Sequence, residues 1–148
     1  MDDPGAKVVD LIFGRWRSQI LYAGVNLGVF EALASGPQTT ISVASSVGAD
    51  AGMLYRLMRA LGSLDLLHED TTKTFSLTPM GELLCKDHPH TMRAQTLLQE
   101  GPEFYAAWKH FPALIKEGKQ EGFVREFGGP LSHICPSTRA MAQYSMRP

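Results

Sequence analysis

The chain has 148 residues, of which 44% are hydrophobic and 20% charged, and its formal net charge is −1. This composition is typical of a globular protein that builds its core without disulfides or metal ions. The near-zero charge gives no general attraction to nucleic acid or to an anionic membrane, and no apolar stretch approaches the roughly 20 residues of a transmembrane helix. Cys85 and Cys135 follow no disulfide or ligand spacing, so we expect reduced thiols in a cytoplasmic protein.

The first segment of the chain combines helical periodicity with few polar residues. Apolar residues recur mostly one, three or four positions apart between Lys7 and Ala34, which predicts two helices over about 6–23 and 25–34 with a bend near Gly24. A small domain rarely buries such a segment on all sides, so we expect a second copy of the chain to cover it. The residues expected at this homodimer interface are Leu11, Ile12, Ile20, Val25, Leu27 and Phe30.

Residues 39–80 have the pattern of a winged helix-turn-helix. Thr39 is placed to cap a short helix that ends at Gly48, and a second, amphipathic helix follows Asp50. Two strand-like stretches around a polar turn then predict a β-hairpin. Helix, turn, helix and hairpin in this order are typical of a winged helix.

The rest of the chain is expected to be helical and then irregular. Short helices are predicted over 80–86 and 91–99 and a longer one over 102–117, with Phe123, Val124 and Phe127 as anchors of an irregular tail that ends in a helical turn at 137–145. The sequence thus predicts a mainly α single domain over 1–148. Its parts are dimerisation helices (6–34), a winged helix (39–80), and capping helices with a tail (91–148).

Residues that could carry chemistry are sparse. No Gly-x-Gly loop and no alternating strand–helix pattern indicate a nucleotide site. Cys85, His88 and His90 lie close enough in sequence to suggest a metal site. However, a proline interrupts this short segment and no second pair of ligands is present, so the pattern favours loop histidines that bind no metal. A hydrolase-type catalytic site with Cys135 as nucleophile and His133 as base would also need a carboxylate and a substrate pocket. We therefore expect no catalytic, cofactor-binding or metal-binding residue.

A DNA-binding regulator is the alternative function. The second helix of the winged unit carries Tyr55, Arg56 and Arg59, which could meet phosphates or bases. However, residues 39–80 contain more acidic than basic side chains, and the hairpin tip is acidic. Duplex affinity depends on neutralising several phosphates, so charge disfavours this alternative.

Aromatic residues offer a second kind of site. Phe104, Tyr105, Trp108 and Phe111 fall on one face of the helix predicted over 102–117. Such a series is most often core, but it can also form the wall of a pocket for a flat apolar ligand. Trp16 and Gln19, one turn apart on the first helix, have the same two interpretations.

Several segments, taken in order, resemble the N-terminal domain of plant-type and acetylserotonin-type O-methyltransferases, which depend on S-adenosylmethionine (SAM). Their "A-x-x-L-G-[IV]-F-[DE]-x-L", "L-x-R-L-L-R-x-L" and "Y-x-L-T-P" motifs are similar to three stretches of this chain, and weaker similarities follow up to its end. The matching stretches are Ala23–Leu33, Leu54–Leu61, Phe75–Pro79, Trp108–Gly118, Phe123–Gly128 and Ala140–Ser145.

The resemblance implies a winged helix that does not bind DNA, an intertwined homodimer, and helices that cap a small hydroxylated acceptor, aromatic or polyketide-like. In that family a Rossmann-type C-terminal domain binds SAM, so at Pro148 the chain stops before that domain is expected, and we expect no methyl transfer by these residues alone. Segment 129–139 is shorter than its family counterpart and contributes no expected pocket residue. The residues implied to cap the acceptor are Trp16, Gln19, Gln99, Phe104, Tyr105 and Trp108.

Overall fold

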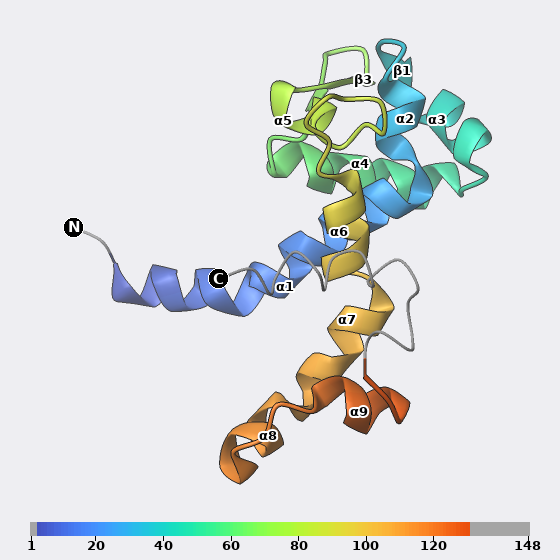
Figure 1. Cartoon of the computed structure of the whole chain (residues 1–148). Helices are drawn as coiled ribbons and strands as arrows, with labels where there is room; N and C mark the ends of the chain where they lie inside the picture. Colours follow the sequence, from blue (N-terminus) through green and yellow to red (C-terminus); the bar gives the residue numbers. More distant parts are fainter. Residues whose placement is uncertain (1–2, 131–148) are drawn as a thin grey trace. The chain divides into compact units, whose positions relative to one another are not determined.

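The computed structural model describes residues 3–130. In this part of the chain the fold is mainly helical, with one small antiparallel sheet (Figure 1). Two compact units are present, one ending at Glu100 and the other beginning at Gly101. The mainly α class predicted from the sequence is therefore confirmed.

Helix α1 (Pro4–Leu27) is the longest element described. It begins because the Asp3 carboxylate accepts a hydrogen bond from the Gly5 N–H at 2.9 Å, with Pro4 in the first turn. Its N-terminal half extends away from the elements that surround α2 and α4 (Figure 1). Helix α2 (Val29–Leu33) follows after a single residue.

The break between these helices lies at Gly28 and not near Gly24, which corrects the sequence prediction. Gly28 has φ +80, a left-handed conformation that glycine adopts without strain, and its N–H reaches back to the Gly24 and Val25 carbonyls. Gly24 instead continues the helix, and its missing side chain leaves room for Leu61.

Helices α3 (Thr40–Val47) and α4 (Ala51–Ser63) form as expected, with the predicted cap at Thr39 and a further cap at Asp50. The Thr39 hydroxyl accepts from the Ser42 N–H at 3.3 Å, and the Asp50 carboxylate accepts from the Met53 N–H at 2.8 Å. Each cap satisfies a donor that the first helical turn leaves free.

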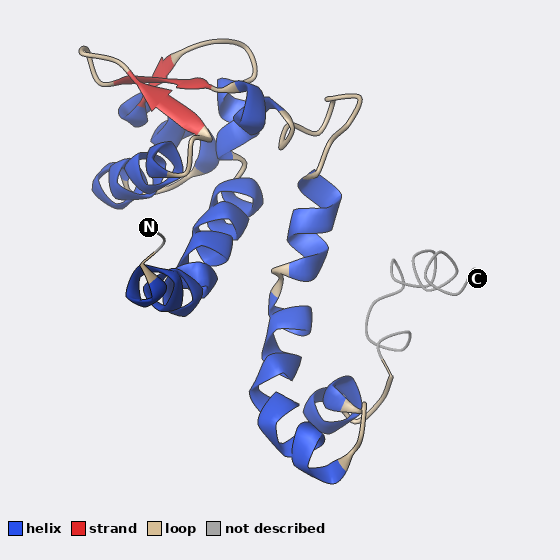
Figure 2. Cartoon of the chain, turned by 90° about the vertical axis from the view of Figure 1, so that its left-hand side faces the viewer, coloured by secondary structure: helices blue, strands red, loops and turns tan. Residues whose placement is uncertain are grey.

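The sheet contains a strand that the sequence did not indicate. The predicted hairpin forms from β2 (Leu67–Glu69) and β3 (Thr74–Leu77), and β1 (Gln38–Thr39) pairs antiparallel with the other edge of β3. The order is thus β1-β3-β2, and the three strands lie side by side in Figure 2. A two-residue strand shows no periodicity, so only its long-range partner reveals it.

The core of the first unit lies between the C-terminal part of α1, the helices α2 to α4 and the sheet. α1 contacts both α4 and α6 (Arg93–Gln99), and α4 packs on β2. Helix α5 (Pro79–Glu82), capped by Thr78, is shorter than the predicted 80–86. The largest fully buried side chains are Phe30, Phe75, Leu33, Met58, Leu61, Val25, Val29 and Val43.

The second unit begins with a helix that is interrupted where a continuous one was predicted. Pro112 explains the break, because it has no N–H for the preceding turn and its ring clashes with the carbonyl four residues earlier. After Gly118, a further helix replaces the expected irregular chain around Phe123. The elements are α7 (Pro102–Ala107), a 3-10 helix η1 (Trp108–His110), α8 (Phe111–Glu117) and α9 (Gly122–Phe127). The helical turn predicted at 137–145 lies outside the described residues.

Candidate functional site

The N-terminal half of α1 exposes large apolar side chains that the chain itself does not cover. Leu11 is 79% exposed and Ile12 64%. Monomeric proteins rarely leave so many neighbouring apolar side chains in water, and such patches typically mark interaction sites. We call this patch the α1 surface; it comprises Val8, Val9, Leu11, Ile12, Phe13 and Trp16.

Asp10 and Arg17 form an ion pair on the same stretch of α1. The Arg17 guanidinium binds the Asp10 carboxylate and also donates to the Asp10 backbone carbonyl at 2.9 Å. The hydrogen bond from Arg17 lowers the pKa of Asp10 below its usual value. The two charges therefore contact each other within α1.

The structure separates the six predicted interface residues into three groups. Leu11, Ile12 and Leu27 are exposed, and Ile20 is half-buried against the core. Val25 and Phe30 are fully buried within their own chain, so they cannot also form a surface for a partner, and this part of the prediction is corrected. Helical periodicity identifies an apolar residue but does not tell which neighbour covers it.

Two of the predicted capping residues lie on α1. Trp16 is 59% exposed, and its ring packs edge-to-face on Phe13 with centroids 4.7 Å apart. The Gln19 side-chain amide donates to the Glu100 carbonyl at 3.1 Å, which ties α1 to the residue after α6. Gln99, the third capping candidate in this unit, is exposed on α6.

The aromatic residues of the second unit form two separate ring contacts. Phe104 contacts Phe123 edge-to-face at 5.2 Å, whereas Trp108 contacts Phe111 at 5.5 Å. Phe104 lies on α7, Trp108 on η1 and Phe111 on α8, so the predicted series spans three elements and not one continuous helix. Trp108 is 63% exposed, while Phe104 and Tyr105 are half-buried.

An ion cluster in this unit was missed from the sequence. The Lys109 ammonium lies 2.7 Å from Glu126 Oε1 and 2.6 Å from Oε2, and His110 Nε2 lies 2.8 Å from the same Oε2. The hydrogen bond from Lys109 lowers the pKa of Glu126, and the hydrogen bond from His110 lowers it further by a smaller amount. The partners are 16 and 17 residues apart, so no local pattern predicts the contact.

The residues once considered as metal ligands have other contacts. His88 Nδ1 accepts from the His90 backbone N–H at 3.1 Å, and the Cys85 thiol donates to the Phe30 carbonyl at 3.5 Å. Burial raises the pKa of the Cys85 thiol, which disfavours the thiolate needed for a metal bond. Between residues 3 and 130 no group of three His, Cys, Asp or Glu side chains is placed to hold a metal ion; His133 and Cys135 lie outside this range.

None of the helices in the described part of the chain combines the length and the apolar character needed to cross a membrane.

Comparison with known proteins gives a consistent result. The chain is 37% identical over 99 residues to 8-amino-8-demethylriboflavin N,N-dimethyltransferase from Streptomyces davaonensis, covering 67% of this chain and 28% of that protein. It is 31% identical to acetylserotonin O-methyltransferase from Bos taurus, covering 79% of this chain and 35% of the relative. The chain thus spans about a third of the length of these relatives.

Solved structures extend the likeness to the fold. The crystal structure of N,N-8-amino-8-demethyl-D-riboflavin dimethyltransferase from Streptomyces davawensis matches 96% of this chain and 43% of its own, with a TM-score of 0.85 and 28% identity. The family model of the O-methyltransferase dimerisation domain matches residues 9–87, which include most of the α1 surface and all of the sheet. The chain therefore belongs to the family of O-methyltransferase dimerisation domains.

Proposed function

We propose that this chain dimerises through the α1 surface and caps the acceptor of a SAM-dependent small-molecule methyltransferase. The observation that carries the proposal is the exposure of the α1 surface in a chain whose family is named for dimerisation. Each large apolar side chain contributes about 1.5–3 kcal/mol when it is fully buried. Six of them on one helical stretch favour association of two copies, against the free-energy cost of bringing two chains together.

We propose that the acceptor is capped in part by residues of α1. Trp16 is the last residue of the α1 surface along the chain and packs on Phe13, so a second chain that covers Ile12 and Phe13 would also lie close to the Trp16 indole. A flat, partly polar ring can pack against an aromatic acceptor and exclude water from it. Gln19, Gln99, Phe104, Tyr105 and Trp108 complete the proposed capping set.

The acceptor is proposed to be a small aromatic or polyketide-like molecule that carries a hydroxyl group. The relatives include proteins named as O-methyltransferases and one named as an N,N-dimethyltransferase, so an amine is an acceptor of the same class. The described residues do not fit SAM itself, because their strands form one antiparallel sheet and no strand–loop–helix unit that cradles a nucleotide. We therefore derive no transfer step from them.

Residues 39–80 are proposed to act as a winged-helix scaffold and not as a DNA reader. The Tyr55 hydroxyl donates to Glu69 at 2.8 Å, and Arg59 Nε lies 3.6 Å from the same carboxylate. Two of the three residues that could contact DNA are thus held by an acidic side chain of β2. This contact opposes phosphate binding, which needs free cations.

Two measurements on the 148-residue chain test the proposal. Light scattering at micromolar concentration should give the mass of a dimer, and a labelled DNA duplex should not be retarded at physiological salt. A monomer would contradict the dimerisation role, and sequence-selective retardation would favour a DNA-binding function.

A further inference from the structure

Helix α6 is held at both of its ends by helices that precede it in the chain. At its first residue, Arg93 Nε donates to the Glu31 carboxylate of α2 at 3.0 Å. Just after its last residue, the Gln19 side-chain amide of α1 donates to the Glu100 backbone carbonyl at 3.1 Å. This second contact joins residues that are 81 positions apart, and it lies at the end of the first compact unit.

The Glu100 carbonyl depends on this contact because the two neighbouring helices leave it without a donor. The last carbonyls of a helix have no intrahelical partner. The chain turns extended at Gly101 (φ −66, ψ 159), and the first hydrogen bond of α7 runs from the Tyr105 N–H to the Gly101 carbonyl at 2.9 Å. Between residues 3 and 130, Gln19 is therefore the only donor to the Glu100 carbonyl.

The connection from Glu100 to α7 is short and stiff. Gly101, which is buried, is the single residue between Glu100 and Pro102, where α7 begins. The proline ring fixes its own φ and favours an extended conformation of the residue before it, in agreement with the ψ of Gly101. A change in the Glu100 peptide is thus passed on to the first turn of α7.

We infer that Gln19 is a positioning residue, which fixes the Glu100 peptide on α1 and thereby sets where α7 begins. This role rests on the proposed function, in which Phe104 and Tyr105 of α7 cap the methyl acceptor. Gln19 belongs to the same proposed capping set, but its amide group is occupied by its own chain. It therefore serves the cap through α7 and not through contact with the acceptor.

Amide NMR of the 148-residue chain tests the inference with Gln19→Met, which keeps the length of the side chain and removes the donor. The Gly101 amide nitrogen shares a peptide group with the Glu100 carbonyl, so its chemical shift reports the hydrogen bond and is expected to move. Amide exchange at Tyr105 should accelerate about fivefold, as the loss of one hydrogen bond implies. The matched control Gln95→Met, on an exposed glutamine of α6, should change neither.

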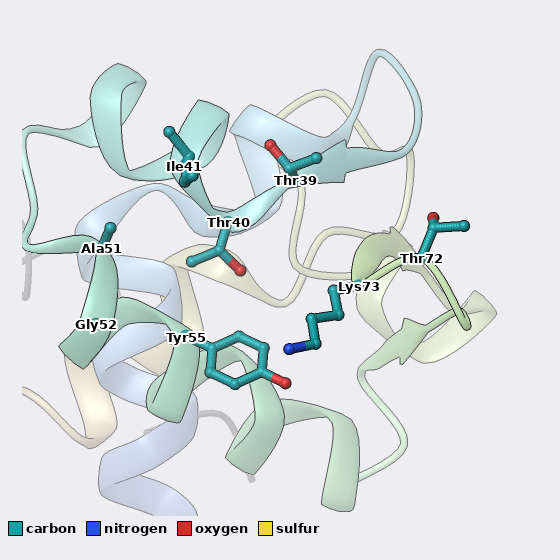
Figure 3. A pocket seen from close by; sticks show the side chains of 8 residues that line it. All are labelled: Thr39, Thr40, Ile41, Ala51, Gly52, Tyr55, Thr72 and Lys73. Carbon is teal, nitrogen blue, oxygen red and sulfur yellow. The ribbon is translucent and has the colours of Figure 1, made fainter.

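A remote part of the first unit serves as an internal reference. A cavity of about 440 Å³ lies between the first turns of α3 and α4 and the tip of the β2–β3 hairpin (Figure 3), and neither Gln19 nor Glu100 lines it. The amides of Gly52 and Tyr55 in its wall should keep their chemical shifts in Gln19→Met. Changes that extend to this cavity would contradict a local role of Gln19.

A second variant separates the hydrogen bond from the shape of the side chain. The ionised carboxylate of Gln19→Glu cannot donate, so at neutral pH this variant should resemble Gln19→Met at Gly101. Below about pH 4 the protonated carboxyl group can donate to the Glu100 carbonyl. The Gly101 shift should then return toward its wild-type value in Gln19→Glu and not in Gln19→Met.

The inference is wrong if Gln19→Met and Gln95→Met behave alike at Gly101, or if acid does not restore the Gly101 shift in Gln19→Glu. Sedimentation of the same samples separates this outcome from the proposed function. A monomeric wild type that shows the expected shifts would contradict the dimer and would support the positioning role of Gln19.

Discussion

Gly24 lies where α1 packs against α4, and it leaves no space for a side chain. A methyl group on its Cα would lie 2.8 Å from Leu61 Cδ1 and 3.1 Å from Phe30 Cε2. Both neighbours are fully buried, so neither can move away without disturbing the core. A residue that weakens an isolated helix is therefore needed for close packing of two helices.

Gly24→Ala should lower the free energy of unfolding. Overpacking costs about 1–3 kcal/mol, and the better helix propensity of alanine recovers at most about 1 kcal/mol of this. Urea unfolding at a fixed protein concentration measures the change. The control is Gly62→Ala in α4, where the added methyl group would lie 3.5 Å from its nearest neighbour, an ordinary contact. Equal stability of the two variants would contradict the packing described here.

At the scale of elements, Glu31 connects α2 to α6 and to the segment before α6. Its Oε1 accepts from Arg93 Nε at 3.0 Å and from the Lys86 backbone N–H at 3.2 Å. Both side chains are partly buried, so water replaces these contacts poorly. Because α6 also packs on α1, this connection helps to keep the first unit together.

Arg93→Gln should destabilise the chain by about 1–2 kcal/mol, since it removes a charge-assisted hydrogen bond and leaves Glu31 with one donor fewer. Amide hydrogen exchange should also accelerate at Lys86. Arg56→Gln, which changes an exposed arginine of α4, is the matched control and should be neutral within about 0.5 kcal/mol. Equal stability of the two variants, with unchanged exchange at Lys86, would show that the connection contributes nothing.

How far the sequence predicts these elements depends on the range of the signal. Caps such as Thr39 and Asp50 act within three residues, and the helices that they begin were predicted correctly. The pairing of Gln38 with Phe75 joins distant residues, so β1 was missed. For the candidate site, the sequence showed that α1 has many apolar residues. It did not show that Val25 is buried by its own chain, because that burial depends on tertiary contacts and not on helical periodicity.

At the scale of the whole molecule, the proposed dimer depends on the α1 surface. The C-terminal part of α1 is buried by α4 and α6, whereas six large apolar side chains near its N-terminus remain in water. Membership of a dimerisation-domain family is consistent with a second copy as the missing cover. The central claim is that association of two chains buries the α1 surface.

Sedimentation velocity of the wild type and of a Leu11→Gln/Ile12→Gln double variant tests this claim most directly. The two substitutions keep the net charge and touch side chains that their own chain leaves exposed. We predict a dimeric wild type, a monomeric double variant with unchanged helical content, and a dimeric Asp10→Asn control. A monomeric wild type, or a dimer that the double substitution leaves intact, would contradict the account.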